Sequence, residues 1–190
     1  MNIDVPANAD WKAITKQSLP VLLGAIVIGV LSGQILVWYQ DRLLAIPVLL
    51  ALVPAVNGIG GNVGSILGAR VASGLHLGGL WSNHARGFRR DVTASLILAI
   101  VTFTFLGLFA SWTGPLLGVA SPISTLDLAT TTLLAGLGLI LVMIVLVVVV
   151  GMLAHRYGWD PDNTMVPVLT TAGDTLGILF LLVAGEVVGI

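Results

Sequence analysis

Asp174 lies near the middle of an apolar stretch, Thr164 to Val188, that is long enough to cross a lipid bilayer. A carboxylate at the centre of a membrane span costs about 2.5–3.5 kcal/mol on insertion scales, and it persists where it faces a polar cavity, a partner charge or an ion. The basic residues cluster at the ends of the apolar stretches, so we expect a cation from solution as its counter-charge. A buried carboxyl group that is hydrogen-bonded or protonated is the alternative.

A second polar stretch inside an apolar block runs from Asn57 to Ser65 and is rich in glycine. Pro54 and the clustered glycines weaken a helix, so we expect free backbone oxygens here, lining a wet pathway together with Gly58 and Gly61. Asn62 and Ser65 are three residues apart and share a helix face. The alternative stays open, because glycines spaced four apart also allow close helix packing.

The last apolar block follows a polar segment, Asp160 to Asn163, and continues through Thr170 and Thr171 to Asp174. We call this polar segment the mouth. Asp160 and Asp174 are 14 residues apart, which places them within about 40° of one helix face and about 21 Å apart along the axis. This stripe, with Thr171 between the two aspartates, favours a cation route from the mouth to the middle of the membrane. Capping of the helix is the simpler role for Asp160.

The ligand types indicate which ion would bind. Carboxylate, amide and carbonyl oxygens, without cysteine and without a histidine at the middle of a span, favour Mg²⁺ or Ca²⁺ over Zn²⁺ or copper. One carboxylate per chain is sparse for a dehydrated ion. Mg²⁺ gives up its waters reluctantly, so it is the ion best held through its hydration shell.

The composition sets the elements that must position these residues. Of 190 residues, 57% are hydrophobic and 9% are charged, whereas soluble domains carry about 25% charged residues. The sequence therefore predicts an all-α membrane protein of five transmembrane helices, with the second and fifth interrupted by Pro and Gly and lining the pore. The predicted spans are Ser18–Trp38, Leu43–Leu75, Val92–Trp112, Leu126–Leu153 and Thr164–Val188.

The second predicted span has about 33 residues, so it must tilt, break or project from the membrane. Residues 1–17 form a short N-terminal arm, and residues 18–190 form one five-helix domain. By the positive-inside rule the N-terminus is cytoplasmic and the C-terminus is outside, in a multi-pass protein of the cell membrane. Asp91 borders a span, where we expect a cap or a solubilising charge. Six basic residues fall on the N-terminal side and only Arg42 on the other: Lys12, Lys16, Arg86, Arg89, Arg90 and Arg156.

Two of these stretches resemble motifs of one family. The sequence from Pro54 to Ser65 resembles the proline-to-Gly-Asn motif in the second membrane helix of MgtE-type Mg²⁺ transporters and their solute carrier family 41 relatives. The sequence from Asp160 to Asp174 resembles that family's last-helix motif, which has Asp-Pro at the mouth and an aspartate 14 residues later. The resemblance covers essentially the whole chain.

The resemblance implies a divalent cation transporter or channel that works as a homodimer, with one pore at the subunit interface. Asp174 of both copies would bind hydrated Mg²⁺, Asn62 would be a ligand lining the pore, and Asp160 would be a site at the mouth. Bacterial members usually add cytoplasmic Mg²⁺-sensing domains, and we expect a single-domain form without them. The expected partners are a divalent ion, the lipid bilayer and a second copy, and not nucleic acid.

Two other classes of protein could also contain these residues. An intramembrane aspartyl protease could use the Gly173-Asp174 pair, but it needs a second membrane-embedded aspartate, and the other four spans offer none. A structural subunit would use Asp174 for packing alone. Stabilisation of the protein by a divalent cation would distinguish a transporter from a structural subunit. We expect a transporter and not an enzyme.

Overall fold

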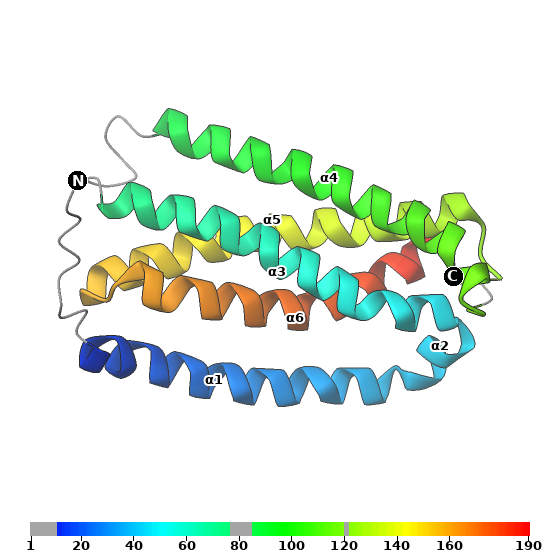
Figure 1. Ribbon diagram of the computed structural model, residues 1–190, viewed down its shortest axis with the longest axis horizontal. Helices are drawn as coiled ribbons and strands as arrows, with labels where there is room; N and C mark the ends of the chain where they lie inside the picture. Colours follow the sequence, from blue (N-terminus) through cyan, green and yellow to red (C-terminus); the bar gives the residue numbers. More distant parts are fainter. Residues whose placement is uncertain (1–10, 77–84, 120–121) are drawn as a thin grey trace, which may run out of the picture.

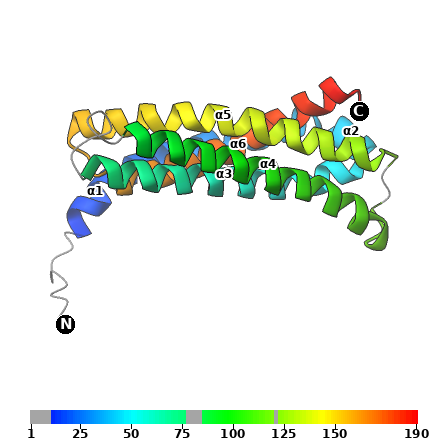
Figure 2. The same ribbon diagram turned by 90° about the horizontal axis from the view of Figure 1, so that it is seen from above.

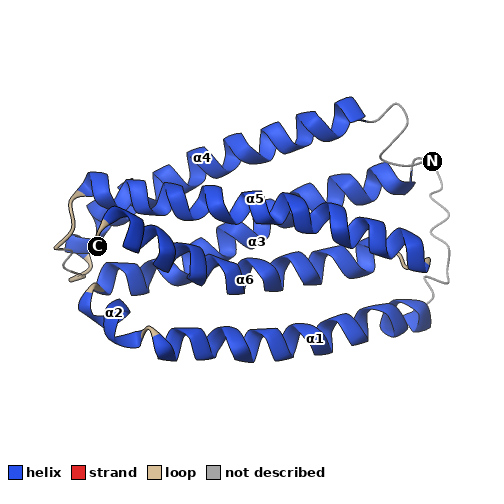
Figure 3. Ribbon diagram, turned by 180° about the vertical axis from the view of Figure 1, so that it is seen from behind, coloured by secondary structure: helices blue, strands red, loops and turns tan. Residues whose placement is uncertain are grey.

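The computed structural model describes residues 11–76, 85–119 and 122–190, and in these ranges every regular element is an α-helix (Figure 1). Five helices are long and apolar enough to cross a membrane, which confirms the predicted all-α architecture. Figure 3 shows that the described elements are helices, with no strand among them. The helices are α1 Trp11–Trp38, α2 Gln40–Ala45, α3 Pro47–His76, α4 Ala85–Leu116, α5 Thr125–Tyr157 and α6 Pro161–Val188.

The over-long second block resolves into two helices. The short α2 ends at Ala45, and Ile46 has an extended backbone with φ −129° and ψ 79° before α3 begins at Pro47. A proline disfavours the helical conformation in the residue before it, and its own fixed φ suits the first turn of a helix. The block therefore breaks near its N-terminal end, and the remaining 30 residues, which form α3, make up the span.

Prolines and glycines do not interrupt α3 or α6 beyond that point. Pro54 and the stretch from Asn57 to Ser65 lie within one continuous helix, as does Pro167 in α6. The helix therefore continues through the stretch in which we expected free backbone oxygens, because glycine lowers helix propensity by only about 1 kcal/mol and tertiary packing decides the outcome.

The proline in α6 has one clear consequence for a backbone carbonyl. Proline has no N–H, so Pro167 cannot donate to the carbonyl of Asn163 four residues earlier. The hydroxyl of Ser18 on α1 donates to this oxygen instead, at 3.4 Å. The freed acceptor thus helps to attach α1 to the start of α6.

α3 and α6 occupy the middle of the bundle, between α1 at one edge and α4 at the other (Figure 1). α5 packs against α3, α4 and α6, and the view from above shows α5 at the back of the bundle (Figure 2). Among the described residues α1 contacts only α6 and α2. The two helices that carry the predicted pathway are therefore central, and α1 is peripheral.

Glycines set how closely the central helices approach one another. A Cβ built at Gly173 would lie 2.6 Å from the Cα and N of Gly61, so the α3 and α6 backbones touch at this point. Gly60 and Gly64 of α3 face Leu139 and Met143 of α5. Gly68 faces Leu169 of α6, so the packing interpretation holds for the three glycines spaced four apart, Gly60, Gly64 and Gly68.

Candidate functional site

The two central helices present a line of small and polar groups at the middle of the bundle. We define the polar strip as Gly58, Asn62 and Ser65 of α3 with Thr170 and Asp174 of α6. All are exposed except Ser65, which is half-buried. Asn62 and Asp174 lie close to the midpoints of α3 and α6. The strip therefore sits at the depth where the hydrocarbon core of a membrane would be.

The strip faces away from α5. Gly60 points at α5 through its contact with Leu139, and Asn62, two residues later, lies about 200° around the helix axis from it. Gly58 meets nothing within 4 Å, which shows open space beside α3. The front of α3 and α6 in Figure 1, between α1 and α4, is thus open in the single chain.

The close approach of α3 and α6 holds the two halves of the strip together. Thr170 lies against Gly61, with its backbone 3.5 Å from the position of a Cβ there. One turn further along α3, the hydroxyl oxygens of Ser65 and Thr170 are 3.4 Å apart. Because small residues at the contact let the backbones approach, side chains from both helices meet at one surface.

The Asp174 carboxylate has no protein partner within the part of the chain that the structure describes. Two ion pairs in this part, Arg42 with Glu186 and Arg70 with Asp91, lie toward the ends of the helices and do not involve Asp174. Three or more His, Cys, Asp or Glu residues nowhere come together there to hold a metal. In a single chain Asp174 is therefore a membrane-embedded carboxylate without a complete set of metal ligands among the described residues.

The rest of the exposed surface at this depth is different in kind. The exposed side chains of α1, α4 and α5 are large and apolar, for example Ile26, Val101, Phe105 and Val145. Such side chains suit contact with lipid tails, whereas an amide, two hydroxyls and a carboxylate do not. The polar strip is the part of this surface that lipid would solvate worst.

Two predicted pathway residues lie between the helices rather than on the strip. Gly61 is buried against Thr170 and Gly173. The side-chain oxygen of Asn57 occupies the space that a Cβ at Gly177 would need, and it is buried without a hydrogen-bond partner among the described residues. Asn57 thus lines the α3–α6 contact from inside.

Thr171 points toward α1 and away from the strip. Its hydroxyl donates to the carbonyl of Pro167 at 2.9 Å, and its side chain lines a mostly apolar groove of about 460 Å³ between α1, α5 and α6. A step of one residue rotates the side chain by about 100°. The structure therefore brings Thr170, but not Thr171, together with Asp174.

Asp160 caps the first turn of α6. Its side chain accepts a hydrogen bond from the backbone N–H of Asp162 at 3.0 Å, and Pro161 occupies the first helical position. The Gln17 side-chain oxygen of α1 accepts from the backbone N–H of Asp160 and from the side-chain amide of Asn163, each at 3.1 Å. A hollow of about 320 Å³ opens beside Asp160, His155 and Gln17. Capping is thus a role that the geometry gives Asp160, and its role as a cation site at the mouth stays a prediction.

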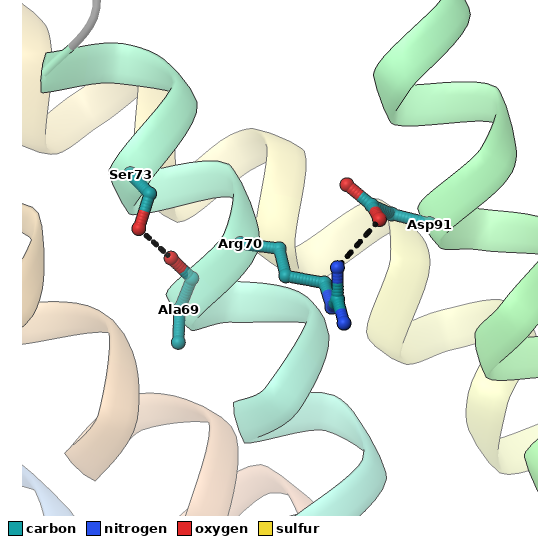
Figure 4. A network of polar contacts seen from close by, with 4 residues as sticks. All are labelled: Ala69, Arg70, Ser73 and Asp91. Atoms are coloured by element: carbon teal, nitrogen blue, oxygen red, sulfur yellow. Dashed lines mark hydrogen bonds and ion pairs between the residues drawn. The ribbon is translucent and has the colours of Figure 1, made fainter.

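Sequence reasoning missed an arginine inside a span. Arg70 belongs to α3, and a guanidinium nitrogen of its side chain lies 3.1 Å from a carboxylate oxygen of Asp91 on α4 (Figure 4). Both residues fall within candidate membrane spans, Pro47–Leu75 and Gly87–Leu116. The assignment of all basic residues to span ends is therefore corrected. The signal was present in the sequence, since a charge inside an apolar block predicts a partner.

The described residues thus form a multi-pass helical membrane protein whose exposed surface bears one polar strip at mid-membrane depth. The chain belongs to the MgtE family, because the family model described as divalent cation transporter matches residues 53–184. That range includes the whole polar strip. The family is one of transporters and not of enzymes.

Two curated relatives are named solute carrier family 41 member 3. The chain is 28% identical to the protein from Rattus norvegicus over 179 residues, which cover 87% of this chain and 37% of the relative. It is 29% identical to the protein from Mus musculus over 145 residues, which cover 70% of this chain and 28% of the relative. The matched region therefore spans 37% of the length of the first relative and 28% of the length of the second. No solved structure matches the chain significantly.

Proposed function

We propose that this chain transports a divalent cation, Mg²⁺ foremost, along the polar strip, and that a second copy of the chain closes the pathway. The observation that carries the proposal is the strip itself: an exposed amide, hydroxyls and the Asp174 carboxylate at mid-membrane depth, on a surface that is otherwise apolar. The family match supports divalent cations as the class of substrate.

The charge on the strip argues for a cation. Asp174 is exposed, and the structure gives its carboxylate no basic partner in the described residues. A divalent ion that keeps its first water shell can interact with carboxylate, amide and hydroxyl oxygens through those waters. Mg²⁺ fits this arrangement because it dehydrates reluctantly, and it needs few direct protein ligands for that reason.

The open side of the strip argues for a second copy. Lipid cannot hydrogen-bond Asn62 or solvate Asp174, so this face needs a polar cover in a membrane. A twofold arrangement would place the same strip opposite itself, because a symmetric dimer uses one surface patch on both subunits. The two Asp174 carboxylates would then carry a total charge of about −2, which a divalent ion neutralises.

The distribution of basic side chains supports the proposed orientation. Lys12 and Lys16 on α1, Arg89 and Arg90 on α4 and Arg156 on α5 gather at the end of the bundle where α1 begins, whereas Arg42 is at the opposite end. We therefore place the start of α1 on the cytoplasmic side and the end of α6 outside.

Ion flux into proteoliposomes tests the proposal. Purified wild-type protein should admit Mg²⁺, reported by an entrapped Mg²⁺-sensitive dye, and a competition series with Ca²⁺ and Mn²⁺ should rank the ions. Asp174→Asn should abolish the flux. Asp162→Asn is the matched control, because it makes the same change at an exposed position in the first turn of the same helix.

Two results would count against the proposal. Flux of Asp174→Asn at the wild-type rate would remove the carboxylate from the pathway. Absence of flux through wild-type protein that is folded and reconstituted in both orientations would favour a structural subunit instead.

A further inference from the structure

The Arg70–Asp91 ion pair stands at the edge of the face that bears the polar strip. Arg70 lies on α3 about 12 Å further along the helix axis than Asn62, at about 1.5 Å per residue, and about 80° around it. It is on the same continuous helix, toward the end where α3 meets the α3–α4 connection. A cation that moves along the strip would therefore pass within reach of its charge.

The pair is poorly explained as a fastening between helices. The Arg70 side chain is 60% exposed and the Asp91 side chain is 23% exposed, with one contact of 3.1 Å between them. Exposed ion pairs contribute little to stability in water, and inside a membrane span the pairing mainly removes the cost of an unpaired charge. Figure 4 shows Arg70 extending from α3 across to α4 with its carboxylate partner on the far side.

An uncompensated arginine at this place would oppose the passage of a cation. Coulomb's law gives the repulsion between the Arg70 charge and a divalent cation about 12 Å away. At the dielectric constant of water this repulsion lowers the local occupancy of the cation by a factor of about three, and at an effective dielectric constant of 20 by a factor of about a hundred. Arg89 and Arg90 are exposed next to Asp91 and have the same sign as Arg70. Among the described residues, Asp91 is thus the acidic residue that pairs with a member of this group of arginines.

We propose that Asp91 neutralises Arg70, so that the cytoplasmic end of the cation pathway does not repel its own substrate. This rests on the proposed transport function. In this role Asp91 does not need to contact the ion, because it acts by neutralising the charge of Arg70. The proposal predicts an asymmetry, because removing the acid leaves a bare positive charge, whereas removing the base leaves a bare negative charge that attracts cations.

The asymmetry defines the experiment. Initial Mg²⁺ flux into proteoliposomes should fall at least about threefold in Asp91→Asn at about 10 mM ionic strength, and the loss should shrink at about 150 mM, where the screening length falls from about 30 Å to about 8 Å. Arg70→Gln should transport at least as fast as wild type, with a KM for Mg²⁺ that is equal or lower. The double variant Arg70→Gln/Asp91→Asn should recover most of the loss.

Glu186→Gln is the matched control. It removes the acid from the other ion pair of the described residues, between α6 and Arg42 of α2, away from the polar strip. Its flux should be unchanged and independent of ionic strength. Melting temperatures of all variants in detergent separate loss of fold from loss of flux, and Arg70→Gln tests the sign of the effect even if Asp91→Asn fails to fold.

Three outcomes would overturn the proposal while leaving the transport function intact. Asp91→Asn could transport like wild type. Asp91→Asn, Arg70→Gln and the double variant could all lose flux equally, which would mean that the pair only joins α3 to α4. Arg70→Gln could raise the KM for Mg²⁺. If wild-type protein shows no flux at all, the proposed function fails first.

Discussion

Gly173→Ala is the substitution for which the structure gives the sharpest expected effect on the α3–α6 contact. The added Cβ would lie 2.6 Å from the backbone Cα and N of Gly61. Backbone atoms cannot rotate aside, so the distance must grow to about 3.4 Å, which separates the two helices by about 0.8 Å at this point. The hydroxyl contact between Ser65 and Thr170, already 3.4 Å long, lies within a turn or so of this position and would be lost.

Gly61→Ala is the matched comparison. A Cβ at Gly61 would meet Thr170 at 3.5 Å, an ordinary van der Waals distance. Both substitutions raise helix propensity by the same amount, about 1 kcal/mol, so the difference between the variants isolates the steric contact. Overpacking a well-packed contact costs about 1–3 kcal/mol. For a chain of this size each kcal/mol shifts the melting temperature by about 2–4 °C.

Intrinsic tryptophan fluorescence on heating in mild detergent measures the difference, since the chain has five tryptophans. We expect Gly173→Ala to melt about 2–12 °C below Gly61→Ala, and its Mg²⁺ flux to fall, because Thr170 and Asp174 move relative to Asn62. Equal melting temperatures and equal flux for the two variants would refute the close backbone contact that positions the strip.

The remaining predictions concern the strip and the topology. Asn62→Leu should strongly reduce Mg²⁺ flux while native mass spectrometry still shows two copies, and unchanged flux would exclude the Asn62 amide from the pathway. Wild-type protein should gain thermal stability in millimolar Mg²⁺, about 2.7 kcal/mol at a concentration a hundred times the dissociation constant. Asp174→Asn should lose most of that gain, and an equal gain in both proteins would place the bound ion elsewhere. Single cysteines introduced at Leu117 and Tyr157, both exposed beyond the apolar cores of their helices, should be labelled from opposite sides of the membrane, and labelling from the same side would contradict the topology.

The helices were predictable because the apolar stretches are long and sharply bounded. A span needs about 20 apolar residues, and the five blocks exceed that length while most of the charges lie between them. The length of the second block predicted that it tilts, breaks or projects from the membrane, and it did not predict the break before Pro47 alone. Its position follows from the restriction that Pro47 places on Ile46, which acts locally.

The orientation of side chains around α3 and α6 could not be predicted in the same way. Neighbouring residues differ by about 100° around a helix, so Thr170 and Thr171 face different helices although they are adjacent in the chain. Which of them faces the strip depends on where α1 and α3 pack. Asn57 lies within the α3–α6 contact for the same reason, opposite Gly177.

The continuous course of α3 shows the limit of local propensity. Glycines and a proline predicted a weakened helix with free backbone oxygens. In the structure Gly60, Gly64 and Gly68 each contact a side chain of a neighbouring helix, and close packing favours the regular helix. Asp174 could be identified as a candidate from sequence because a carboxylate in the middle of a long apolar stretch is visible without knowing which helices surround it. The Arg70–Asp91 pair required the structure, since its members belong to different helices.

The accessibility of single cysteines on the strip tests the central claim most directly. The chain has no native cysteine, so Thr170→Cys and Val101→Cys can be compared without background. Both positions are exposed in the single chain near the middle of a span, Thr170 on the strip and Val101 on the apolar surface of α4. A water-soluble cationic methanethiosulfonate reagent reacts with a thiolate, which forms where water has access.

We predict that Thr170→Cys in proteoliposomes reacts with this reagent, loses Mg²⁺ flux on reaction, and reacts more slowly when Mg²⁺ is present, whereas Val101→Cys stays unmodified. Failure of Thr170→Cys to react while the protein transports Mg²⁺, or equal modification of both variants, would contradict a water-filled cation pathway along the polar strip.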